Sequence, residues 1–146
     1  CTIFEQRKEL GGMLYYGIPN YRLPKERLAE DIQNILATGV ETKMNTCIGD
    51  GDGEISFKML KENYDAVYIS IGAHTDKKLG IPGEDAKGVI SAIQMLRDIG
   101  DGNPPDFTGK NVIVVGGGNV AMDATRSAIR LPCSVKESVP SASFSK

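Results

Sequence analysis

The stretch "NVIVVGGGNVAMDATRSAIR", residues 111–130, contains the strongest chemical pattern of the sequence. Gly116, Gly118 and Ala121 form a G-x-G-x-x-A pattern directly after an apolar run and directly before a helical pattern. In this setting the first glycine permits a tight turn, the second lets a pyrophosphate approach the backbone, and the alanine lets the helix pack closely on its strand. The pattern therefore predicts a dinucleotide-binding turn between a buried strand and a helix.

Backbone amides would supply most of this predicted site. Besides Gly117, the N–H groups near Asn119 and Val120 are expected to face the phosphates, because they lie at the positive end of the helix dipole. A glycine turn that binds nothing is the alternative, and the fit of both flanks argues against it. Glu137 lies where the next strand would present an acid to a ribose, but Pro132 and a lack of apolar residues precede it. We interpret Glu137 as a solvated charge, so the sequence does not choose between NAD and NADP.

A second candidate acid lies at the start of the chain. The run "TIFE" ends at Glu5, and a strand that ends in an acid is typical of the second strand of a nucleotide-binding fold, whose carboxylate binds ribose hydroxyls. This observation alone is a weak indication.

The elements around these residues alternate between strand and helix, which predicts an α/β fold. Helices are expected from Pro24 to Gly39, with a short one after Ser56, and over 91–99 and 121–130. Strands are expected over 1–5, 40–49, 65–73 and 111–115, and loops over 15–24, 49–54, 77–89 and 100–110. The nearly unbroken apolar run "DAVYISIGA", residues 65–73, is typical of a central strand that is covered on both faces. In helix 91–99 we expect Ile93, Leu96 and Ile99 to face inward.

Composition excludes several classes of function. The 17 basic and 19 acidic residues give a net charge of −2 and are interspersed, so neither nucleic acid nor a membrane is an expected partner. No apolar run approaches the roughly 20 residues of a membrane span, and the cytoplasm is the default location. Cys1, Cys47 and Cys133 form no metal-binding spacing, and the turn 49–54 lacks the terminal carboxylates of a calcium loop. We therefore expect no metal site.

Four stretches together resemble one family. "FEQRKELGGMLYYGIPNYRLP", "DAVYISIGA", "LGIPGED" and "VVGGGNVAMDATRSAIRL" are similar, in this order, to the glutamate synthase small-subunit group of FAD- and NAD(P)-dependent oxidoreductases. The group includes the flavin and nucleotide domains of dihydropyrimidine dehydrogenase and of bifurcating ferredoxin–NADP reductases. The resemblance implies an incomplete architecture of two Rossmann-like domains. It assigns 1–84 to a partial FAD-binding domain, 85–109 to a connecting helix and linker, and 110–146 to the start of an NAD(P)-binding domain with an irregular tail.

The resemblance also implies cofactor-binding residues. Glu5 would bind the adenosine ribose of FAD with Arg7 beside it, and the backbone of Ile48 would meet the adenine. Gly72 and Ala73 would make a close approach after the central strand. The residues expected along or near the flavin are Gly11, Gly12, Leu14, Gly17, Ile18, Pro19 and Arg22. Residues Gly116 to Ala121 would hold the NAD(P) pyrophosphate. For each there is a structural alternative: the glycines make turns only, Arg22 pairs with a surface acid, and Ile48 packs.

In function, the resemblance implies hydride transfer from NAD(P)H to FAD and electron transfer to a partner subunit or iron–sulfur domain. Flavin disulfide reductases place two cysteines after their glycine pair, whereas residues 13–16 here contain none. We therefore expect no disulfide relay. No catalytic side chain is assigned, and His74 is interpreted as a loop residue.

The match also has limits. No G-x-G-x-x-G loop precedes Cys1, and the similarity stops at Pro132. We expect an internal fragment that retains no stoichiometric FAD, binds NAD(P) weakly at best and is inactive alone. The alternative is a noncatalytic module for interaction or assembly that forms oligomers through open sheet edges. Size-exclusion chromatography with light scattering distinguishes the two.

Overall fold

The computed structural model describes residues 1–131 and 134–135 and contains two compact units. The first unit comprises Cys1–Tyr15 and Leu23–Ala73. The second comprises Tyr16–Arg22 and the chain from His74 onward. These packing units differ from the domains expected at 1–84, 85–109 and 110–146, which are defined by cofactor and stay a prediction.

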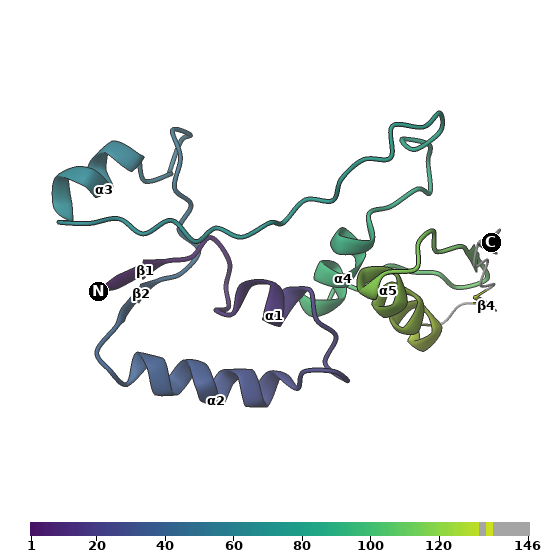
Figure 1. The fold of residues 1–146 in the computed structure, drawn as a ribbon, viewed down its shortest axis with the longest axis horizontal. Helices are drawn as coiled ribbons and strands as arrows, with labels where there is room; N and C mark the ends of the chain where they lie inside the picture. The colour runs from purple at the N-terminus through teal and green to yellow at the C-terminus, as the bar shows by residue number, and fades with distance from the viewer. Residues whose placement is uncertain (132–133, 136–146) are drawn as a thin grey trace, which may run out of the picture. The chain divides into compact units, whose positions relative to one another are not determined.

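The first unit contains a parallel strand pair connected by helices. Strand β1 (Thr2–Phe4) pairs with β2 (Glu41–Lys43), with Thr2 opposite Glu41. The connection contains α1 (Gly12–Tyr16), whose last residue belongs to the second unit, and α2 (Lys25–Leu36), as Figure 1 shows. Helix α2 begins after Pro24, buries Leu28 and is followed by Gly39 at φ +90°. Both end signals were predicted from the sequence, and the helix is confirmed.

A tight loop and a short helix follow β2. Ile48 and Ile55 form an isolated parallel bridge that closes the turn between them. Helix α3 (Phe57–Asn63) begins at Ser56, whose side chain accepts a hydrogen bond from the Met59 N–H at 3.2 Å. The predicted cap is confirmed.

Three expectations for the first part of the chain are wrong. Residues 65–73 form no strand and are exposed, with Tyr68 at 91% and Ile71 at 77%. A central parallel strand requires a hydrogen-bonded neighbour, and no strand in the described ranges pairs with this segment. The second strand has only three residues of the expected 40–49, and Gly12–Tyr16 is helical where 15–24 was predicted to be loop throughout.

The second unit contains another strand–helix–strand sequence. Strand β3 (Asn111–Val112) leads through α5 (Asn119–Arg130) to β4 (Ser134–Val135), and the two strands are parallel. Helix α4 (Ala92–Gly100) packs beside α5 (Figure 1). Ser91 caps α4 by accepting the Gln94 N–H. The core cluster consists of Met95, Leu96, Phe107, Ala124 and Ala128.

The structure also corrects expectations for this unit. The run 111–115 is not a buried strand, because Ile113 and Val115 are 64% and 73% exposed while Val112 and Val114 pack against the core. The connector 100–110 lies inside the unit, since Phe107 belongs to its core. Ile93 was expected to face inward but is only half-buried, whereas Met95 of the same helix is buried.

Strand β4 lies where an irregular tail was predicted. Its two residues pair with β3 although the surrounding sequence has few apolar side chains, because a parallel ladder is formed by backbone groups. Pro132, Cys133 and Glu137 lie outside the described residues. In the part of the chain that the structure describes, no helix is long and apolar enough to cross a membrane.

Candidate cofactor-binding site

The turn between β3 and α5 has the geometry expected of a dinucleotide-binding turn. Gly116 adopts φ +133°, a backbone conformation that side chains rarely permit. A Cβ at this position would lie 3.2 Å from the Cβ of Ala121, which is itself buried. Gly116 and Ala121 are therefore small for the same reason, since the turn and the first part of the helix approach each other closely.

The next two glycines face open space. A Cβ built on Gly117 or Gly118 meets nothing within 4 Å. Gly118 is the N-cap of α5 in an extended conformation, and no side chain caps the helix. The first N–H groups of a helix have no partner within it, and Asn119 and Val120 are exposed at this end. The turn thus offers backbone donors and free approach, which fits a phosphate group.

The exit of β1 places Glu5 beside the exit of β2. The backbone N–H of Glu5 donates to the Lys43 carbonyl at 3.0 Å, and the Thr46 N–H donates to the Glu5 carbonyl at 2.9 Å. One carboxylate oxygen of Glu5 accepts the Arg7 N–H at 2.9 Å. The carboxylate that was expected to bind a ribose is therefore fixed at the end of its strand and already holds the following loop.

Gly11 lies on the turn into α1, and Gly12 and Leu14 lie within that helix. Gly11 adopts φ +113°, and a Cβ there would lie 2.9 Å from a methyl group of Leu28. Lys25, which the sequence reasoning did not single out, donates to the Leu14 carbonyl at 3.3 Å and to the Tyr15 carbonyl. Burial lowers the pKa of Lys25. Its ammonium satisfies carbonyls at the end of α1 and so fixes the helix that precedes the Gly17 loop.

Gly17, Ile18 and Arg22 lie on a loop of the second unit. Gly17 is buried, and the Arg22 N–H donates to the Pro19 carbonyl at 2.9 Å, which closes a turn. The Arg22 guanidinium lies 2.6 Å from a carboxylate oxygen of Asp123. Arg22 does pair with an acid, as the structural alternative held, but this acid is buried within α5. Asp123 was missed because nothing in the sequence distinguishes it from an exposed helical carboxylate.

The remaining candidates are Ile48, which lies in a hydrogen-bonded bridge, and Gly72 and Ala73, which lie on an exposed irregular segment. The bridge at Ile48 uses the N–H of Gly49 and the carbonyl of Cys47, so the backbone of Ile48 points away from Ile55. Gly72 adopts φ +66° and, with Ala73, is exposed on the irregular segment that follows residue 65. The N–H groups of Asn45 and Thr46 donate to the carbonyls of Arg7 and Glu5, which brings these two candidates close to the segment that leads to Ile48.

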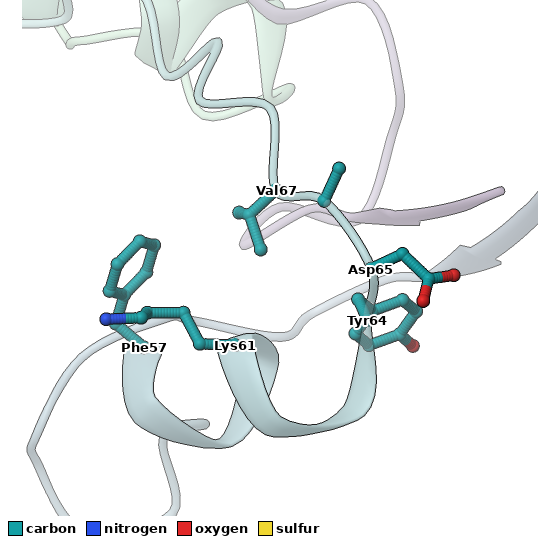
Figure 2. Close-up of a pocket in the computed structure, with 6 residues that line it drawn as sticks. Phe57, Lys61, Tyr64, Asp65 and Val67 are labelled. Carbon is teal, nitrogen blue, oxygen red and sulfur yellow. The ribbon is translucent and has the colours of Figure 1, made fainter.

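A separate hollow lies beside α3. It has a volume of about 440 Å³ and is bordered by Phe57 and Lys61 of the helix and by the segment from Tyr64 to Val67 (Figure 2). None of the expected cofactor-binding residues lines it. Within residues 1–131 and 134–135, no group of three potential ligands could hold a metal ion.

Comparison with protein families identifies the class. The family model described as pyridine nucleotide-disulphide oxidoreductase matches residues 4–140. The chain belongs to this family, and its α/β dinucleotide-binding fold is that of a flavoprotein of this class.

Three relatives in this comparison are subunits of NADP(H)-dependent enzymes by their names. The chain is 46% identical over 131 residues to the NADP(+)-dependent formate dehydrogenase subunit beta of Moorella thermoacetica, covering 88% of this chain and 18% of that protein. It is 44% identical to the NADPH-Fe(3+) oxidoreductase subunit beta of Geobacter sulfurreducens, covering 89% and 20%. It is 33% identical to the glutamate synthase (NADPH) small chain of Escherichia coli, covering 89% and 29%. The last match agrees with the family resemblance seen in the sequence.

A solved structure agrees on the fold. A point mutant of FprA from Mycobacterium tuberculosis superposes with a TM-score of 0.72 at 26% identity, covering 86% of this chain and 28% of that one. The chain spans between 18% and 29% of the length of these four proteins.

Proposed function

We propose that this chain supplies parts of the FAD and NAD(P)H sites of an NAD(P)H-dependent oxidoreductase, in which hydride passes from nicotinamide to flavin. The main support is the turn from Gly116 to Ala121, whose backbone conformation, open face and helix N-terminus fit a pyrophosphate. NADPH is the preferred donor in this proposal, because the three relatives named above include NADP(+) or NADPH in their names.

The residues of the chain bind and orient the cofactors. The turn and the amides of Asn119 and Val120 would hold the nucleotide pyrophosphate, and Glu5 would bind the FAD ribose. The residues placed along the flavin would be Gly11, Gly12, Leu14, Gly17 and Ile18. FAD, when bound, supplies the chemistry that accepts a hydride from the nicotinamide.

Neither proton transfer by a side chain nor thiol chemistry is part of this proposal. Direct hydride transfer requires no general acid or base between the two rings. The helix after the glycine pair contains Leu14, Tyr15 and Tyr16 where disulfide reductases place cysteines, and both described cysteines, Cys1 and Cys47, are free thiols. Electrons would therefore leave the flavin for another centre, and relatives named subunit beta or small chain make a partner subunit the proposed acceptor.

NADP⁺ binding tests the proposal directly. We expect ligand-detected NMR to show weak binding of NADP⁺ to the chain, and Gly118→Ala to weaken it about tenfold or more, because the new Cβ occupies the path of the pyrophosphate. Met122→Ala is the matched control, since this exposed side chain lies on the same helix outside the turn.

One result would contradict the proposal. Equal NADP⁺ affinity of Gly118→Ala and wild type would remove the turn from the binding site. A stoichiometric flavin absorbance band of the purified chain would support the FAD part of the proposal and would overturn only the sequence-based expectation that the chain retains no FAD.

A further inference from the structure

The loop 16–22 is attached to α5 by several contacts within the second unit. The Arg22 guanidinium forms its ion pair with Asp123 at 2.6 Å, and the Tyr21 hydroxyl donates to the Asp123 backbone carbonyl at 3.5 Å. Arg130, at the far end of α5, lies 4.1 Å from the centre of the Tyr21 ring. Two adjacent residues of the loop therefore contact α5 at two places, about one turn after its start and at its last residue.

The carboxylate of Asp123 depends strongly on Arg22. Its side chain is only 8% exposed, whereas that of Arg22 is 44% exposed. The other oxygen of Asp123, Oδ1, has no hydrogen-bond partner in the described part of the chain, and neither has the buried Ser127 hydroxyl one turn later. A buried charge that loses its partner is strongly destabilising, so the carboxylate holds Arg22 in place.

The two partners lie next to the two parts of the candidate site. Arg22 ends the loop that contains Gly17 and Ile18, which are expected along the flavin. Asp123 follows Ala121, where the nucleotide-binding turn enters α5. We propose that Arg22 and Asp123 are positioning residues that tie the flavin-side loop to the nucleotide-binding helix, so that binding of a dinucleotide phosphate at the turn orders the loop.

This inference rests on the proposed function for its ligand, but not for the attachment itself. A charge-assisted hydrogen bond to a rigid helix has one preferred geometry, because the guanidinium is planar and the helix fixes the carboxylate. An anion at the N-terminus of α5 stabilises this helix, and the contacts of Arg22 and Tyr21 transmit that order to the loop.

Hydrogen exchange of the chain without ligand tests the attachment. We expect amides of residues 16–22 to exchange about tenfold faster in Asp123→Asn than in wild type, since the neutral amide of Asn forms a weaker hydrogen bond with the guanidinium than the carboxylate does. Arg22→Lys retains the charge and should restore part of the protection that Arg22→Met loses. Glu30→Gln is the control, because it breaks the exposed Arg27–Glu30 pair. Unchanged exchange in Asp123→Asn, with circular dichroism confirming the fold, overturns the proposal.

A second arm of the experiment tests the coupling. NADP⁺ should slow exchange of residues 16–22 in wild type and not in Asp123→Asn, while NMR shows that both still bind it. Equal slowing in both proteins overturns the coupling. Wild type that binds no NADP⁺ at all overturns the proposed function together with the coupling, whereas the ligand-free comparison still decides the attachment.

Discussion

The two strand–helix–strand segments place their candidate residues in opposite ways. From β3 through α5 to β4, the candidates are six consecutive residues at one turn. Between β1 and β2 and beyond, they are dispersed from Glu5 to Ala73. A contiguous site requires only that one turn folds correctly, whereas a dispersed site requires correct packing of several elements. The candidate site of the β1–β2 segment, hereafter the first segment, should therefore be the more sensitive to loss of core packing.

The largest expected effect comes from the core of the first segment. Leu28→Ala removes a side chain that is 7% exposed and contacts the Gly11 turn, so we expect it to lower the free energy of unfolding by about 2–5 kcal/mol. Ile35→Ala, on the same helix at 55% exposure, should cost less than about 1 kcal/mol. Urea denaturation measures both. Similar losses for the two variants would show that α2 contributes no specific core.

An intermediate effect is expected at the contiguous turn. Gly116→Ala places a Cβ 3.2 Å from that of Ala121 at a backbone φ of +133°, and such strain costs about 1–3 kcal/mol. Gly117→Ala, whose Cβ meets nothing within 4 Å, is the matched control. The two melting temperatures should differ, with only the first variant destabilised. If both variants are as stable as wild type, the turn is not constrained by the approach of Ala121.

The same contrast explains what could be predicted from the sequence. The three long helices, α2, α4 and α5, depend on local signals, namely caps and apolar spacing, and their presence is confirmed. The positive φ of Gly116 agrees with the expected tight turn, whereas the dinucleotide-binding role of that turn stays a prediction. The strand expected at 65–73 was wrong because a parallel strand depends on a neighbour that its own residues do not specify. The expected domain bounds, the cofactor contacts and the oligomeric state stay predictions.

Long-range contacts were the other part that the sequence could not provide. Arg22 was singled out, but its partner Asp123 lies about a hundred residues away, and no local pattern indicates that α5 buries this carboxylate. Lys25 was missed for a related reason, since its contacts to the Leu14 and Tyr15 carbonyls require the chain to turn back between α1 and α2. In both cases the missing information is tertiary packing.

The smallest expected effect concerns the loop between Ile48 and Ile55. A hydrogen bond to Glu54 raises the pKa of the Cys47 thiol, and the Gly51 N–H, which donates to Glu54 at 2.9 Å, lowers the pKa of that carboxyl. The thiol is the unreactive form, so Cys47 should be alkylated by iodoacetamide severalfold more slowly than the exposed Cys1 at neutral pH. Peptide mass spectrometry measures each rate. Glu54→Gln should accelerate Cys47 specifically, whereas Glu62→Gln, outside this loop, should not.

The direction of the two shifts sets the pH dependence of the loop. Because the pKa of Glu54 is lowered in the folded loop, its carboxylate stabilises the loop at a pH above the ordinary pKa of 4.5. This stabilisation is lost as the pH falls through the lowered pKa. Because the pKa of Cys47 is raised in the folded loop, its thiol stabilises the loop at a pH below the ordinary pKa of 9.0. This stabilisation is lost as the pH rises through the raised pKa. Protection of the Gly51 amide, after correction for the intrinsic exchange rate, should therefore be greatest between these limits. Protection that stays constant from acid to alkaline pH would show that the ionisation of neither group stabilises the loop.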